Sequence, residues 1–133
     1  MGITPAAPLI AVMNSSRDLV TLLQTSLVQD GFRAVTHVST LRSGVADVLA
    51  FLQVEHPDVV VYSVSPPYRE SWDILTEVRR QCPHPSFVVV TTNVGALRQW
   101  VSPADAIELI GKPCDLDQIT RAVQHALAAR AAA

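Results

Sequence analysis

The sequence has little of what several common functional classes require. Its two cysteines, Cys82 and Cys114, match no metal or redox spacing, and its five glycines form no phosphate-binding loop. The formal net charge of −2 gives no basic surface for nucleic acid or an anionic membrane. No stretch approaches the roughly 20 apolar residues of a membrane span, and the N-terminus lacks the pattern of a signal peptide. We therefore expect a cytoplasmic protein that binds neither nucleic acid nor a membrane directly.

Lysine is almost absent, which makes the one lysine informative. Lys112 follows an apolar, strand-like run and is followed at once by Pro113. The sequence has ten lysines and arginines in total, and the other nine are arginines. A single lysine at the end of a predicted strand indicates a specific role for that residue and not a general contribution to surface charge.

The length and composition predict one compact domain. The 133 residues are enough to bury a real core, and 49% hydrophobic with 17% charged residues is typical of a folded protein. We expect an N-terminal tail over residues 1–8, a single domain over 9–128 and a short alanine-rich tail over 129–133.

Strand-like and helix-like segments alternate along the chain. Short apolar runs predict five strands, at residues 9–13, 33–38, 58–62, 87–90 and 106–110. Leucine, valine and isoleucine at helical spacing predict a helix after each strand, with these marker residues: Leu19, Leu22, Leu23 and Leu27; Val45, Val48, Leu49 and Leu52; Ile74, Leu75 and Val78; Leu97, Trp100 and Val101; Leu116, Ile119, Val123 and Leu127.

Five such units predict an α/β fold in which helices cover both faces of a parallel sheet. Because crossovers are right-handed, the flavodoxin-like (βα)5 three-layer sandwich with strand order 2-1-3-4-5 is favoured. In that order, the carboxyl ends of the strands flank a crevice where sites form. The side chains expected there are polar but carry no carboxylate: Asn14, Ser15, Ser63, Thr91 and Lys112.

Together with their neighbours, these residues resemble the receiver domain of bacterial two-component response regulators, over about residues 9–127. The matching pieces are Gly-Lys112-Pro113 after the fifth strand, Thr91 after the fourth, Pro67 after the third and Pro57-Asp58 before the third. The resemblance implies a role in phosphorelay signalling. In that family, an acidic pair and an aspartate bind Mg²⁺ and accept a phosphoryl group, which the threonine and lysine then contact.

This sequence departs from the family at the positions that do the chemistry. By alignment the acidic pair falls on Asn14 and Ser15, and the acceptor aspartate falls on Ser63. Neutral amide and hydroxyl oxygens are weak Mg²⁺ ligands, and a serine without an adjacent base is a poor nucleophile. The aromatic residue that rotates on activation in the family falls on Leu109. We therefore expect no metal, no cofactor, no catalytic residue and no enzymatic activity.

The resulting hypothesis is a pseudo-receiver that signals by phosphorylation-independent protein contact. The family uses its fourth helix, fifth strand and fifth helix for partners, so the expected interaction face contains Leu97, Trp100, Val101 and Leu109, for a homodimer or a foreign protein. The alternative is a sensor of a small molecule or anion that binds in a pocket of Lys112, Thr91 and Ser63. Thr91 could instead only tie its loop, and Lys112 could be a relic.

Overall fold

The computed structural model describes residues 7–38, 44–102, 107–112 and 115–132. Its centre is one parallel sheet with the order β2-β1-β3-β4-β5, which confirms the topology expected from the sequence. The strands are β1 (Leu9–Asn14), β2 (Arg33–Val38), β3 (Val59–Val64), β4 (Ser86–Thr91) and β5 (Glu108–Gly111). The helices are α1 (Arg17–Gln29), α2 (Gly44–Glu55), α3 (Tyr68–Gln81), α4 (Val94–Arg98) and α5 (Leu116–Ala132).

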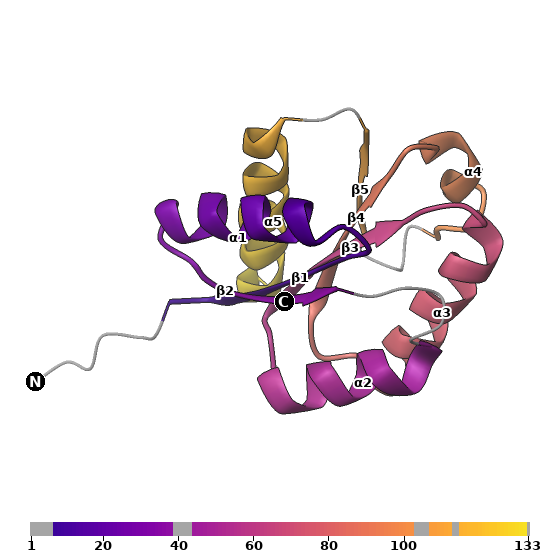
Figure 1. Ribbon diagram of the computed structural model, residues 1–133, viewed down its shortest axis with the longest axis horizontal. Coiled ribbons are helices and arrows are strands. Elements are labelled where there is room, and N and C mark those ends of the chain that lie inside the picture. Colours follow the sequence, from indigo (N-terminus) through magenta and orange to yellow (C-terminus); the bar gives the residue numbers. More distant parts are fainter. Residues whose placement is uncertain (1–6, 39–43, 103–106, 113–114, 133) are drawn as a thin grey trace, which may run out of the picture.

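The helices form two layers, one on each face of the sheet. Helices α1 and α5 lie together on one face, whereas α2, α3 and α4 cover the other (Figure 1). Side chains alternate along each strand, so each layer has its own core. On the α1/α5 face the strand residues are Ile10, Val12, Val59, Val61, Val88 and Val90. On the opposite face they are Ala11, Met13, Val60, Tyr62, Val64, Phe87 and Val89.

Helix α1 shows how local sequence sets an element that borders the site. Ser16 caps its N-terminus by accepting a hydrogen bond from the Leu19 backbone N–H at 3.3 Å, as a serine cap should. Gly31, with φ of +95°, follows the helix. Of the four leucines at helical spacing that predicted this helix, Leu22 is 51% exposed, whereas Val20, which was not among them, is buried. The residues of α1 that face the sheet are Val20, Leu23 and Leu27, and Leu22 lies to one side of this buried face.

The last two helices differ in length from the prediction. Helix α4 has only the residues Val94–Arg98, so Trp100 and Val101 follow it rather than lie within it. At the start of α5, Gln118 Oε1 accepts a hydrogen bond from the Asp115 backbone N–H at 2.7 Å, as in a capping box. Helix α5 then continues to Ala132, into the segment that the sequence suggested was a tail.

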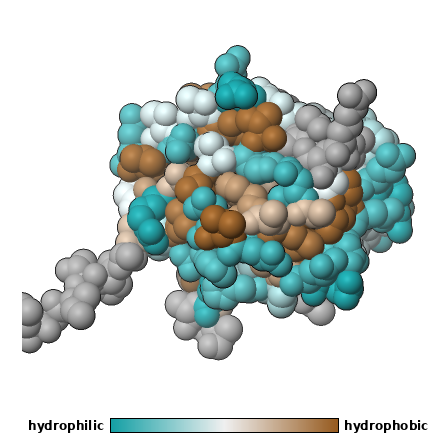
Figure 2. Space-filling view, turned by 60° about the horizontal axis from the view of Figure 1, so that its bottom comes forward, coloured by the Kyte–Doolittle hydropathy of each residue, from teal (hydrophilic) through white to brown (hydrophobic). Residues whose placement is uncertain are grey.

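The face of the molecule that carries α2 has a mixed polar and apolar surface. On the side that carries α2, apolar residues reach the surface between polar ones (Figure 2). Val54 of α2 is the most exposed large apolar residue of the described chain, at 77%. None of the described helices is both long and apolar enough to cross a membrane.

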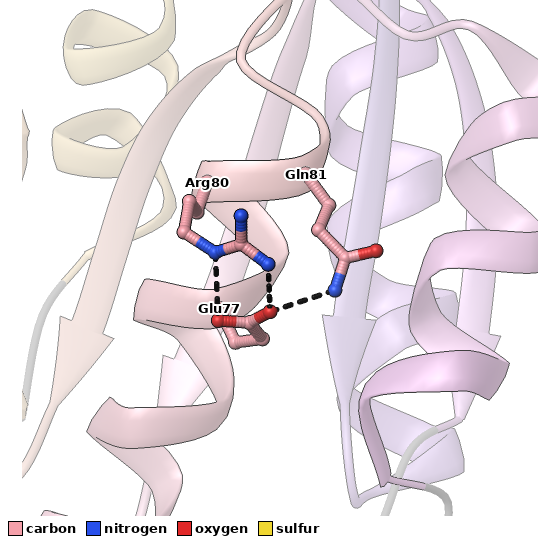
Figure 3. A network of polar contacts seen from close by, with 3 residues as sticks. All are labelled: Glu77, Arg80 and Gln81. Carbon is pink, nitrogen blue, oxygen red and sulfur yellow. Dashed lines mark hydrogen bonds and ion pairs between the residues drawn. The ribbon is translucent and has the colours of Figure 1, made fainter.

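A polar network on α3 stabilises an exposed stretch of that helix (Figure 3). Glu77 accepts two hydrogen bonds from Arg80, at 3.0 and 2.5 Å, and one from Gln81 Nε2 at 2.7 Å. These bonds and the Arg80 charge favour the carboxylate, so the pKa of Glu77 falls to about 2. The same contact raises the pKa of Arg80.

Candidate functional site

The first part of the candidate site is a direct bond between β1 and β3 at their carboxyl ends. Asn14 closes β1 and is only 5% exposed. Its Nδ2 donates a hydrogen bond to Ser63 Oγ at 2.5 Å. Its Oδ1 accepts one from the Ser16 backbone N–H at 2.8 Å. Both ends of the Asn14 amide are therefore used to join β3 to the start of α1, a link that sequence reasoning did not anticipate.

This donor set does not fit a resident Mg²⁺ ion. Ser15 is exposed, and the side-chain oxygen Oδ1 of Asn14 already accepts a hydrogen bond from a backbone N–H. Mg²⁺ prefers charged oxygen ligands in near-octahedral geometry. The acids of the first turns of α1 and α3, Asp18 and Glu70, are exposed. Among the residues that the structure describes, no three His, Cys, Asp or Glu side chains form a group that could hold a metal.

The structure places Thr91 on the other side of the sheet from Ser63. In the β3–β4 register, Ser63 lies opposite Val90, and Val64 lies opposite Thr91. Because side chains alternate, Ser63 shares the α1/α5 face with Val90, and Thr91 shares the opposite face with Val64. Thr91 is fully buried, and its Oγ1 accepts a hydrogen bond from the Asn93 backbone N–H at 3.2 Å. This bond supports the simpler interpretation, in which Thr91 ties the loop after β4.

Lys112 and Ser63 share a pocket of about 300 Å³ between α1 and α5. The Lys112 backbone N–H donates to the Thr91 carbonyl at 2.7 Å, which fixes the chain directly after β5. The pocket walls are mainly leucines and other aliphatic residues that sequence reasoning had assigned to the core alone: Leu19, Leu22, Leu23, Val90, Leu116 and Ile119. The predicted site residue Pro113 and the neighbouring Cys114 lie outside the described residues.

The opposite side of the sheet edge holds an aromatic cluster between α3 and the segment after α4. The rings of Trp72 and Trp100 lie 6.2 Å apart, and the Arg69 guanidinium lies 5.1 Å from the centre of the Trp100 ring. The Tyr68 hydroxyl and Thr92 Oγ1 are hydrogen-bonded at 2.6 Å. The buried Trp72 therefore packs against Trp100, and the start of α3 is held to the segment that follows β4.

The predicted interaction face needs a correction. Leu97 is fully buried, because the single turn of α4 directs its one buried side chain into the core between α3 and β5. Trp100, Val101 and Leu109 are half-buried and pack against the same core. These side chains therefore contribute more to the core than to the surface. The part of the predicted face that a partner could reach lies on β5 and α5.

Comparison with solved structures agrees with this geometry. The chemotaxis protein CheY4 of Vibrio cholerae superimposes with a TM-score of 0.73 over 91% of this chain and 99% of that one, at 18% identity. A response regulator from Thermotoga maritima gives a TM-score of 0.74 at 23% identity, over 92% of this chain and 98% of that one. The fold is that of a receiver domain.

The likeness extends to part of a longer protein. NtrX from Brucella abortus matches 92% of this chain with only 26% of its own, at 20% identity and a TM-score of 0.74. The sequence itself matches no protein-family model, and a comparison with curated proteins finds no significant match. At identities this low the structural likeness establishes the receiver fold, and the site must be judged from the residues present.

Proposed function

We propose that this chain is a receiver-like signalling domain that acts by protein contact, without phosphoryl transfer and without enzymatic activity. The observation that carries the proposal is the Asn14–Ser63 hydrogen bond, at the positions where the resemblance places an Mg²⁺-binding acid and the phospho-acceptor. A receiver of this kind transmits a signal through its abundance or its partner. We further propose that it acts in the cytoplasm, where its cysteines would stay reduced.

The surroundings of Ser63 support the loss of phosphoryl transfer. A serine hydroxyl needs a general base to become a nucleophile. The nearest polar partner of Ser63 is the Asn14 amide, which donates to Oγ and can remove no proton from it. The described residues that line the pocket around Ser63 are aliphatic apart from Lys112, and none of them is a histidine or a carboxylate.

The accessible interaction face is a groove of about 480 Å³ between β5 and α5. β5 is an edge strand of the sheet, so one side of its backbone is not covered by another strand. Glu108 Oε1 and His125 Nδ1 lie 2.6 Å apart across the groove, and Arg121 lines it from α5. An edge strand beside mixed charges suits a protein partner, either foreign or a second copy.

The first test is exposure to a small phosphodonor with Mg²⁺, followed by intact-protein mass spectrometry. We expect no mass change, while an aspartate-containing receiver treated in parallel gains one phosphoryl group. A phosphoryl group on Ser63 would overturn the proposal.

The interaction face is tested by light scattering across a wide concentration range, together with capture of protein partners. The variant Arg121→Glu changes the groove, and Arg17→Glu on α1 is the matched control. We expect complex formation, with self or with a partner, to weaken only in Arg121→Glu. Equal weakening in both variants would remove the groove from the proposal.

A further inference from the structure

A second feature does not depend on whether phosphoryl transfer is lost. We propose that the pocket between α1 and α5 binds a small monocarboxylic acid with an apolar body. The carboxylate would lie at Lys112 and Ser63, and the apolar body would lie among the leucines of α1 and the first turn of α5. The proposal assigns the pocket a ligand with two chemically different ends.

The size and lining of the pocket are those of a small-molecule site. Its volume of about 300 Å³ lies at the lower end of the range for ligand pockets, roughly 300–1,000 Å³. Such pockets are mostly apolar, with a few polar groups that orient the ligand. Here three walls come from three parts of the chain: α1, the end of β4, and the start of α5. The aliphatic lining consists of Leu19, Leu22, Leu23, Val90, Leu116 and Ile119.

Both polar groups can donate hydrogen bonds into the pocket. Asn14 Oδ1 accepts from the Ser16 backbone, so the amide must present Nδ2 to Ser63, and Ser63 Oγ must accept. The hydroxyl hydrogen of Ser63 is then left to donate elsewhere. Lys112 supplies an ammonium, which has three donors and no acceptor. Two donors at one end of a pocket are complementary to the two oxygens of a carboxylate.

The described residues place no counter-charge in the pocket. None of the described residues that line it is acidic, and none of the described carboxylates forms an ion pair with Lys112. Lys112 is half-buried, so covering it with a purely apolar ligand would remove its water without a counter-charge, which is costly. A strongly hydrated ion such as inorganic phosphate would instead lose water against six aliphatic side chains. A carboxylate on an apolar body satisfies both ends.

Leu22 marks the mouth of the pocket. It is 51% exposed although it lines the pocket. A ligand that covers Leu22 removes apolar area from water, which adds to the affinity. Substitution of Leu22 should therefore weaken binding without disturbing the core.

The experiment is titration with hexanoate, followed by calorimetry and by the methyl NMR signals of the leucines and isoleucines. Acetate lacks the apolar body, hexanol lacks the charge, and inorganic phosphate lacks both the body and the single charge. We expect saturable binding of hexanoate that shifts the signals of Leu22, Leu23 and Ile119, and binding at least about tenfold weaker for the other three probes. Phosphate or acetate binding as tightly as hexanoate would overturn the proposal.

Two variants and one control locate the binding. Lys112→Met keeps the apolar stem and removes the charge, and we expect it to lose about tenfold in hexanoate affinity while hexanol is unaffected. Leu22→Gln tests the mouth at an exposed position, and it remains informative if Lys112→Met folds poorly. Arg98→Met removes an exposed cation of α4 outside this pocket and should bind hexanoate normally. Unchanged affinity in both Lys112→Met and Leu22→Gln would overturn the proposal, as would absence of saturation at millimolar hexanoate.

Discussion

Asn14 donates its side-chain N–H to Ser63 across two neighbouring strands, over a distance of 2.5 Å. Each residue stands where the receiver resemblance places an acid. Two ionised carboxylates at this separation would repel each other, so they would have to share a proton or a cation. A neutral amide and a hydroxyl need no cation, so this pair joins the carboxyl ends of β1 and β3 by itself.

Asn14→Ala should destabilise the fold. It removes two hydrogen bonds from a buried position and leaves the Ser16 backbone N–H without its partner. We expect a loss of about 1–3 kcal/mol in the free energy of unfolding, measured by urea denaturation. Ser15→Ala changes an exposed neighbour and should stay within about 0.5 kcal/mol of the parent. Equal stability of Asn14→Ala and the parent would show that the bond contributes nothing.

Restoring the missing carboxylates should create a metal site. The triple variant Asn14→Asp, Ser15→Asp, Ser63→Asp replaces neutral donors with charged oxygens, which Mg²⁺ prefers. We expect calorimetric Mg²⁺ binding in the triple variant and none in the parent at millimolar Mg²⁺. The triple variant should also be less stable without Mg²⁺, because the introduced charges repel. Comparable Mg²⁺ binding by the parent would contradict our interpretation of the donor set.

Tyr62 should ionise only at unusually high pH, and the free energy of unfolding should fall in strongly alkaline solution. Burial disfavours its phenolate and raises its pKa from 10.0 to about 12. Because the folded-state pKa lies above the unfolded one, this contribution is complete below about pH 10 and is lost as the pH rises toward 12. Its size is roughly 3 kcal/mol, taken from two pKa units.

The variant Tyr68→Phe makes Tyr62 the only tyrosine, since the chain has two. Ultraviolet absorbance then follows phenolate formation, while circular dichroism follows the fold. We expect phenolate to appear only near pH 12 or together with unfolding. Ionisation near pH 10 in a folded protein would refute the burial argument.

The Glu77 network on α3 should stabilise the protein only above acidic pH. The pKa of Glu77 is lowered from 4.5 to about 2 by its bonds to Arg80 and Gln81. A lowered folded-state pKa means that the contribution is present above about pH 4.5 and is lost as the pH falls toward 2. Glu77→Gln should therefore lower the melting temperature slightly at pH 7, and the difference should shrink in acid. A difference that does not depend on pH would indicate a packing effect.

Leu97 should behave as a core residue and not as part of an interface. Because its side chain is fully buried, Leu97→Ala should cost about 2–5 kcal/mol of folding free energy. Substitution of the exposed neighbour Arg98 by Ala is the control and should change stability little. Chemical denaturation of both variants provides the measurement. A small effect of Leu97→Ala would restore Leu97 to the surface that the sequence suggested.

Much of the fold could be predicted from the sequence because its signals are local. Strand β2 begins and ends where expected, and His56-Pro57 follows the end of α2, since the residue before proline disfavours the helical region. Strand order followed from the alternation of elements and the handedness of crossovers. That Asn14, Ser15 and Ser63 replace the acids at the carboxyl ends of β1 and β3 could also be predicted from the sequence.

Only the tertiary structure decided which polar residues meet. Ser63 and Thr91 both end strands, but the β3–β4 register puts them on opposite faces, and register depends on packing between strands that are far apart in the chain. The same holds for Leu97, which the sequence placed on the interaction face and which is fully buried, and for Leu22, which is 51% exposed. A helical spacing defines a stripe of apolar residues, whereas the neighbouring elements decide which of them are covered. The sequence thus determined the frame and its missing charges, and packing determined the Asn14–Ser63 bond and the pocket beside it.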